Sequence, residues 1–316
     1  MRGIPELPTG FTLVEGERGV LACRPAEREA LAAAGFSPDG TRRGASAEHL
    51  PDARESGREP LGMLEVDGVS CLARRFTHGG LARALTGARF SDPGRPFAEL
   101  ALSERLRTLG IATPRVVAAR AVSVKPFGFE LTLVTERVDG VRDMGWILGE
   151  VRSGRRSRAE LRDALIACGR LIGALHRVGF LHADLQPANL LVRSAVDGGA
   201  AEAIAIDLDR SRFVWGEGAE AQPLPAQLAR KNLGRLWRHV RRRETEYGAV
   251  LSRVDRARFL RAYLRTQGTK PADMAELSRA IDEAASRGGV GHRIGWWLER
   301  LFGRGNDRRA SAQSEN

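Results

Sequence analysis

Two side chains five residues apart in a short segment carry the clearest chemical signal in the sequence. They are Asp184 and Asn189, in the run FLHADLQPANLLV from Phe180 to Val192. Phosphoryl transfer to a hydroxyl needs a carboxylate that accepts or orients the hydroxyl proton, and oxygen ligands for a magnesium ion. Asp184 suits the first role and Asn189 the second, because a neutral amide adds no repulsion against phosphates. The alternative explanation is a loop in which the aspartate only stabilises a turn.

A second aspartate, Asp207, ends the short apolar segment AIAID. An aspartate in that position can hold the metal ion that bridges nucleotide phosphates. The residues between Asn189 and Asp207 predict a strand, a turn and a strand, which would return Asp207 to the side of Asn189. Together with the amphipathic helix that precedes them, the two segments indicate a kinase that uses ATP and Mg²⁺, with Asp184 as its base.

Two residues beside these segments have structural interpretations. We expect His182 to form hydrogen bonds rather than to act as a base. Asp209 is either a second carboxylate on the metal side or the ion-pair partner of Arg210, and we favour the ion pair.

A kinase site of this type also needs a cation for the α- and β-phosphates and a helix glutamate that holds it. Arg74 is the candidate cation and Glu99 the candidate acid, with Glu104 as the second choice. Because the two faces of a strand alternate, a register shift of one residue would make Arg75 the inward residue. Alternatively, Arg74 is a solvated strand residue. The sequence has no GxGxxG loop, and an isolated glycine such as Gly57 is weak support for a phosphate loop.

The surrounding elements predict an α+β fold with two lobes, of the protein-kinase-like type. An Asp67-Gly68 turn between apolar runs predicts a hairpin, and an apolar stripe from Leu161 to Leu175 predicts an amphipathic helix. The other expected elements are helices over 25–34 and 97–109 and strands over 116–124 and 129–137. The expected divisions are an N-terminal extension (1–44), a small β-rich N-lobe (45–138), a larger α-helical C-lobe (139–305) and a disordered tail (306–316).

The composition is basic, with 50 Lys and Arg against 39 Asp and Glu and a net charge of +11. Such a surface attracts polyanions of any class, and GC-rich coding is another explanation of the many arginines. A nucleic-acid partner is disfavoured because aromatic residues make up only 6% and no stacking motif accompanies the arginines. Cys23, Cys71 and Cys168 lie far apart and predict no disulfide or metal framework. We see no signal peptide and no membrane span, which favours the cytoplasm.

Several of these segments resemble the lipopolysaccharide core kinase family, in particular its 3-deoxy-D-manno-octulosonic acid (Kdo) kinases. The resemblance covers roughly residues 58–242. Leu208 stands where the family has phenylalanine, which is an apolar replacement. The matching motifs are Arg74 to Leu81, Phe97 to Glu99, His182 to Asn189, Ile206 to Arg210 and Asn232 to Leu236.

This resemblance implies ATP with Mg²⁺ and a membrane-embedded glycolipid, a lipopolysaccharide precursor, that is phosphorylated on a sugar hydroxyl. It also implies a Gram-negative cell and a place on the cytoplasmic face of the inner membrane, with peripheral contact to anionic lipid. The basic segment over 230–243 either binds sugar carboxylates or lipid phosphates, or is a solvated helix face. The amphipathic segment over 293–304 either lies in a bilayer interface or docks on the core.

Two other functions remain open at this point. One is a phosphotransferase of the same fold for a small molecule such as an aminoglycoside, a choline-like compound or a sugar. The other is an inactive kinase-like binding module, for which Arg74 in place of lysine is the main support. The sequence does not indicate the acceptor hydroxyl, the oligomeric state or any regulation.

Overall fold

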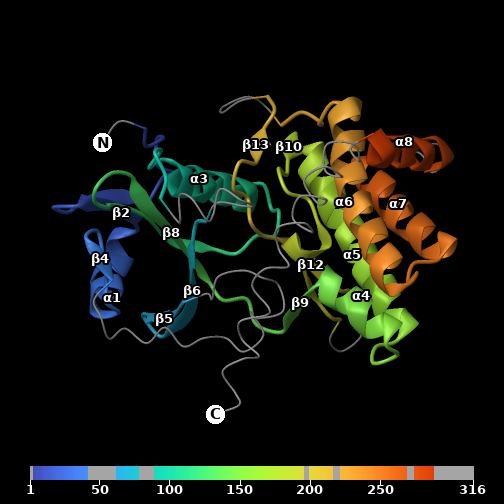
Figure 1. Ribbon diagram of the computed structural model, residues 1–316, viewed down its shortest axis with the longest axis horizontal. Coiled ribbons are helices and arrows are strands. Elements are labelled where there is room, and N and C mark those ends of the chain that lie inside the picture. Colours follow the sequence, from blue (N-terminus) through green and yellow to red (C-terminus); the bar gives the residue numbers. More distant parts are fainter. Residues whose placement is uncertain are drawn as a thin grey trace, which may run out of the picture.

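The computed structural model describes residues 3–41, 62–77, 89–195, 199–215, 221–268 and 274–287. Within these residues a lobe built on a β-sheet is followed by a lobe built mainly from helices (Figure 1). This confirms the predicted α+β, two-lobed fold. No helix of the described part has both the length and the apolar character that crossing a membrane requires.

The first lobe is organised by a six-stranded antiparallel sheet with the order β1-β2-β7-β8-β6-β5. Asp67 and Gly68 both have positive φ, 52° and 73°, in the turn between β5 and β6. That conformation suits a tight hairpin turn and matches the prediction. The strands are β1 (Thr12–Glu15), β2 (Gly19–Cys23), β5 (Gly62–Val66), β6 (Val69–Arg75), β7 (Val116–Ser123) and β8 (Phe129–Glu136).

The residues expected to form a separate N-terminal extension contribute to this same sheet. β2 pairs with β7, and all five of its residues are buried. A strand that is buried on both faces shows no alternation of polar and apolar residues, so its short apolar run gave no strand signal. The predicted helix over 25–34 is present. It consists of the 3₁₀ turn η1 (Pro25–Glu27) and α1 (Arg28–Ala33), and the short strands β3 (Phe36–Ser37) and β4 (Gly40–Thr41) follow.

Helix α3 (Arg95–Thr108) lies against the sheet and has a buried face that includes Phe97, Leu100 and Leu106 (Figure 1). Glu99 lies on the same helix and is only 4% exposed. A buried carboxylate of this kind needs a cation or hydrogen-bond donors around it. The packing of α3 therefore brings an acidic group toward the boundary between the lobes.

The second lobe is centred on α5 (Arg158–Arg177), whose predicted stripe of Leu161, Leu165, Cys168, Ile172 and Leu175 is buried. A capping box formed by Ser157 and Glu160 begins this helix. The other elements are β9 (Val141–Asp143), α4 (Met144–Arg152), β10 (Phe180–Leu181), η3 (Pro187–Asn189), β11 (Leu190–Arg193), β12 (Glu202–Ala205), β13 (Arg212–Phe213), α6 (Ala226–Tyr247), α7 (Arg253–Gln267) and α8 (Met274–Arg287).

Two glycines allow α5 and α7 to approach closely. A methyl group at Gly169 would lie 2.5 Å from the Phe259 carbonyl oxygen, and one at Gly173 would lie 2.9 Å from the Tyr263 carbonyl oxygen. These glycines are four residues apart and so share one face of the helix. The contact therefore depends on two positions without side chains.

The three cysteines are free and buried. Burial raises the pKa of Cys71 to about 11 and that of Cys168 to about 12, so these thiols stay protonated at neutral pH. Several predictions concern residues outside the described ranges. These are Gly57, the basic amphipathic segment over 293–304 and the tail over 306–316.

Candidate active site

The loop between β10 and β11 joins Asp184 to Asn189 directly. The Asn189 side-chain amide donates to the Asp184 carbonyl oxygen at 2.8 Å and to Asp184 Oδ2 at 3.2 Å. Gln186 Nε2 donates to the same Oδ2 at 2.5 Å. Asn189 is completely buried, whereas the Asp184 side chain is 42% exposed. Neutral donors thus hold Oδ2 of the carboxylate, which remains accessible.

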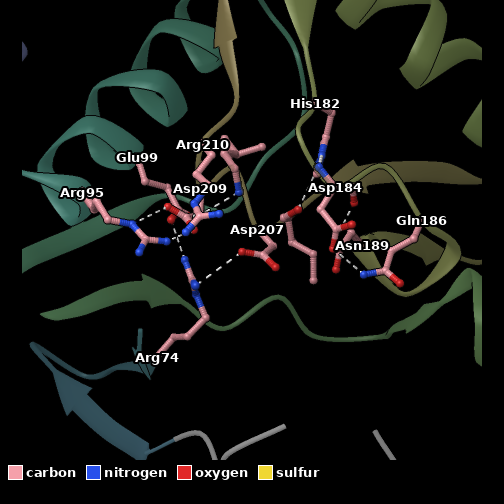
Figure 2. Close-up of polar contacts among 12 residues, drawn as sticks. Arg74, Arg95, Glu99, His182, Asp184, Gln186, Asn189, Asp207, Asp209 and Arg210 are labelled. Carbon is pink, nitrogen blue, oxygen red and sulfur yellow. Dashed lines mark hydrogen bonds and ion pairs between the residues drawn. The ribbon is translucent and has the colours of Figure 1, made fainter. Parts of the chain in front are cut away.

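The β11–β12 hairpin returns the chain to this loop, as predicted. Leu190 pairs with Ala205, and the Ile206 N–H donates to the Asn189 carbonyl oxygen at 3.1 Å. Asp207 follows with φ 60°, a left-handed conformation that aspartate and asparagine tolerate better than most residues. Its side chain is 29% exposed and lies between Arg74 and the loop over 184–189, which we call the catalytic loop after its predicted role (Figure 2).

Arg74 connects the sheet lobe to this arrangement. Its guanidinium contacts Glu99 Oε2 at 2.5 Å and Asp207 Oδ1 at 3.4 Å (Figure 2). The other carboxylate oxygen of Glu99 accepts from the Leu208 backbone N–H at 3.1 Å. Glu99 therefore holds both the cation from β6 and the backbone that follows Asp207.

The two residues considered as alternatives have other partners. Arg75 pairs with Glu130 at 2.9 Å and is half-exposed, and Glu104 pairs with Arg24 at 2.8 Å. In the observed register of β6, Arg74 is consequently the residue that meets Glu99 and Asp207.

Burial and charge act in opposite directions on this ion pair. Burial works to lower the pKa of Arg74, but Glu99 and Asp207 outweigh it and raise that pKa. Burial also raises the pKa of Glu99, and Arg74 offsets part of that effect. Arg74 thus remains a cation whose second contact is the partly exposed carboxylate of Asp207.

Asp209 has a partner that the sequence analysis missed. It forms the expected ion pair with Arg210 at 4.0 Å, but Arg95 Nε donates to its Oδ1 at 3.1 Å and a second Arg95 nitrogen contacts its Oδ2. Arg95 lies in the first turn of α3, far from Asp209 in the sequence, so only the folded chain reveals this contact. It is a second link between the two lobes.

Two buried histidines fix the backbone beneath the loop. His182 Nδ1 accepts from the Asp184 N–H at 3.2 Å, so Nδ1 carries no proton. The proton is on Nε2, which donates to the Ile206 carbonyl oxygen at 3.1 Å. Burial lowers the pKa of His182, so the ring is neutral at pH 7. These contacts agree with a structural role for His182.

The second histidine, His176, joins the loop to helices α6 and α7. Asn232 donates to the His182 carbonyl oxygen at 2.8 Å, and its Oδ1 lies 3.1 Å from His176 Nε2. The Tyr263 hydroxyl lies 3.0 Å from the other ring nitrogen of His176. Burial lowers the pKa of His176 to about 4. Asn232 belongs to one of the motifs identified in the sequence, whereas His176 and Tyr263 had no sequence signal.

Asp207 and Asn189 are the side chains that can hold a magnesium ion. The described residues contain no cluster of three His, Cys, Asp or Glu side chains suited to a metal. Magnesium in kinase sites is commonly bound through one or two protein groups together with substrate phosphates and water. One carboxylate and one amide beside an accessible region therefore fit this ion, with the amide nitrogen of Asn189 directed to Asp184.

A two-lobed fold with this constellation defines a kinase-like phosphotransferase. The chain belongs to the lipopolysaccharide kinase (Kdo/WaaP) family, whose model matches residues 54–263. This confirms the resemblance inferred from the sequence. The chain is accordingly an enzyme of a kinase family, which implies the use of ATP.

Individual relatives agree with the family. A 3-deoxy-D-manno-octulosonic acid kinase of Stenotrophomonas maltophilia (strain K279a) is 30% identical over 214 residues, which cover 66% of this chain and 77% of that protein. A kinase of the same name from Actinobacillus succinogenes is 25% identical over 207 residues, covering 64% and 79%. A solved structure of WaaP in complex with acyl carrier protein covers 87% of this chain and 98% of its own, with a TM-score of 0.53 and 22% identity, and supports the fold.

Proposed function

We propose that this enzyme transfers the γ-phosphoryl group of ATP to a sugar hydroxyl of a lipopolysaccharide precursor, on a Kdo-type inner-core residue. The observation that carries the proposal is the meeting of Asp184, Asn189 and Asp207 with the Arg74–Glu99 pair in one site. The family and the names of the relatives support the class of acceptor.

In this proposal the oxygen of the acceptor hydroxyl bonds to the γ-phosphorus, while the bond between the γ-phosphorus and the β-phosphate oxygen breaks. Asp184 accepts the proton that the hydroxyl loses. Asn189 and Gln186 hold the carboxylate in place through Oδ2. Arg74 faces the α- and β-phosphates, and Glu99 keeps it there. Asp207 and Asn189 would hold Mg²⁺, which neutralises charge on the phosphates when bound.

The acceptor class also implies where the enzyme works. A lipopolysaccharide precursor is anchored in a membrane, and ATP is available on the cytoplasmic side of the inner membrane. The net charge of +11 favours peripheral contact with anionic lipid at that face. Co-sedimentation with anionic vesicles at low and high salt tests this contact. Equal sedimentation with neutral and anionic vesicles would contradict it.

The decisive experiment uses γ-labelled ATP, Mg²⁺ and Kdo–lipid A in detergent micelles. We expect label on the sugar, released as a sugar phosphate by mild acid cleavage of the lipid. Parallel reactions with glucosamine, choline and kanamycin test the small-molecule alternative. Transfer to one of these soluble acceptors but not to Kdo–lipid A would overturn the proposed acceptor, and no transfer to any of them would favour the inactive binding module.

A further inference from the structure

A groove of about 750 Å³ lies beside the catalytic loop. His182 and Ala183 form its wall next to Asp184, and residues from β10, β13, α6 and α8 form the rest. Arg235, which lines the groove, donates to Asp184 Oδ1 at 3.3 Å, whereas Asn189 and Gln186 donate to Oδ2. The two carboxylate oxygens thus have different partners, and the partner of Oδ1 belongs to the groove.

The groove is strongly basic. Arg230 has an acidic partner, Glu276, at 3.1 Å. Arg212 and Lys231 are exposed and have no ion-pair partner within the described residues. Five lining residues are basic, and one, Glu283, is acidic: the basic residues are Arg212, Arg230, Lys231, Arg235 and Arg238.

Two of these cations repel one another. The Arg238 side chain donates to the Ala284 carbonyl oxygen at 2.9 Å, which is a neutral acceptor. Burial and the neighbouring charge of Arg235 both lower the pKa of Arg238. Partly buried like charges are unfavourable unless an anion compensates them. Asp184 compensates the charge of Arg235, whereas Arg238 has no ion-pair partner in the described part of the chain, and a bound anion in the groove would compensate it.

We propose that this groove binds an acidic group of the acceptor, a carboxylate or a phosphate, and that Arg235 aligns the bound acceptor with Asp184. The proposal rests on the proposed function and assigns the acceptor to a particular surface. Guanidinium groups bind carboxylates and phosphates through paired hydrogen bonds, which fix orientation as well as position. An acceptor held by Arg212, Lys231 and Arg238 presents its neighbouring hydroxyl to the Oδ1 side of the base.

The position of the proposed nucleotide-binding residues supports the assignment of the acceptor to the groove. Arg74, with Asp207 beside it, lies on the sheet-lobe side of Asp184 and Asn189 (Figure 2). The groove lies on the α6 side of the catalytic loop. The base therefore stands between a region suited to nucleotide phosphates and a separate region suited to another anion, as transfer between two anionic substrates requires.

The test compares two double variants that each remove two exposed positive charges. Arg212→Gln/Lys231→Gln changes the groove, and Arg261→Gln/Arg265→Gln changes α7 outside it. For the groove variant we expect the KM for Kdo–lipid A to rise about 10- to 100-fold, because charge-assisted contacts of two exposed side chains with the acceptor are lost. kcat and the KM for ATP should stay within about twofold. Equal acceptor KM values for the two double variants would overturn the proposal.

Modified acceptors identify the acidic group. Kdo–lipid A is compared with its sugar carboxyl methyl ester and with a preparation that lacks the lipid phosphates. The modification that removes the acidic group bound in the groove should raise the KM for the acceptor in the parent enzyme. The same modification should have little further effect on that KM in Arg212→Gln/Lys231→Gln. If both modifications affect the parent and the groove variant equally, the groove does not bind an acidic group.

A binding measurement separates this proposal from the proposed function. Calorimetric titration of Kdo–lipid A micelles into Asp184→Asn protein, with and without the groove substitutions, needs no catalysis. Weaker binding in the groove variant supports the groove even if no phosphate is transferred by the parent enzyme. If the parent enzyme transfers phosphate but binding is equal with and without the groove substitutions, the groove does not bind the acceptor. The proposed function then remains intact.

Discussion

The two sides of the site are held by different kinds of interaction. On the side of the sheet lobe, Arg74, Glu99 and Asp207 form a chain of charged contacts, and Arg95 adds a contact to Asp209. On the side of the helical lobe, Arg235 of α6 makes one charged contact with Asp184, but the network beneath the catalytic loop consists of neutral groups. These are His176, His182, Asn189, Asn232 and Tyr263.

The difference follows from what each side must do. The charged groups of the sheet side can exchange their contacts with one another for contacts with phosphates and a metal ion, because each contact depends on charge rather than on a fixed donor and acceptor. A buried neutral network has fixed donors and acceptors, and losing one partner leaves the other unsatisfied. The helical side therefore sets the geometry of the base, and the sheet side supplies the charge.

Removing the base tests the helical side most directly. Asp184→Asn keeps the shape of the side chain, and kcat should fall by about 10²- to 10⁴-fold because proton transfer is lost. Steady-state kinetics with Kdo–lipid A measure the effect. Asp163→Asn, at an exposed ion pair with Arg162 on α5, is the control and should be neutral. A loss of less than about threefold in Asp184→Asn would mean that another group accepts the proton.

The next effect in size is expected from removing the charge of Asp207, which lies where the two sides of the site meet. Asp207→Asn retains a residue that tolerates φ 60°. We expect kcat to fall by about 10³-fold, since metal-ion stabilisation of transition-state charge amounts to several kcal/mol. The magnesium concentration at half-maximal rate should rise as well. An unchanged magnesium dependence would contradict the assignment of Asp207 as a ligand.

The neutral side should lose stability in mild acid. The folded pKa of His176 is about 4, below the ordinary value of 6.5, so the unfolded chain takes up the proton first as pH falls. The contribution of the neutral ring is complete above about pH 6.5 and is lost toward pH 4, to a total of about 3 kcal/mol. Urea unfolding at pH 7.5 and 5 should show a smaller pH effect in His176→Gln than in the parent. Equal pH effects would show that His176 does not carry this dependence.

The charged side should show a smaller, more local effect. Arg74→Lys keeps the charge but cannot reproduce contacts made by two separate guanidinium nitrogens. We expect kcat/KM for ATP to fall about tenfold, as for one lost charge-assisted hydrogen bond. Arg75→Lys, one residue along the same strand, should have no effect. Equal losses in the two variants would remove the special role given to Arg74.

Local patterns predicted most of the elements but not their assembly. The predictions of the Asp67-Gly68 hairpin and of the apolar stripe of α5 were correct because both features depend on residues close together in the sequence. The position of β2 against β7 depends on pairing between residues about 100 apart, which no local pattern contains. That is why residues 12–23 were assigned to an extension rather than to the sheet.

The contacts within the site divide in the same way. The spacing of Asp184 and Asn189 and the hairpin before Asp207 predicted contacts that the structure contains, as did the choice of Glu99 as the partner of Arg74. The roles proposed for these residues in catalysis stay predictions. Arg95 and Arg235 were not connected to the aspartates, because each reaches its carboxylate only after separate helices have packed.

The close approach of α5 and α7 extends the site to the rear of the helical lobe. Because Gly173 has no side chain, Tyr263 can stand next to His176, which in turn orients Asn232 under the carbonyl of His182. Substitutions at the buried contact between α5 and α7 would thus disturb the alignment of Asp184, although this contact lies outside the candidate active site.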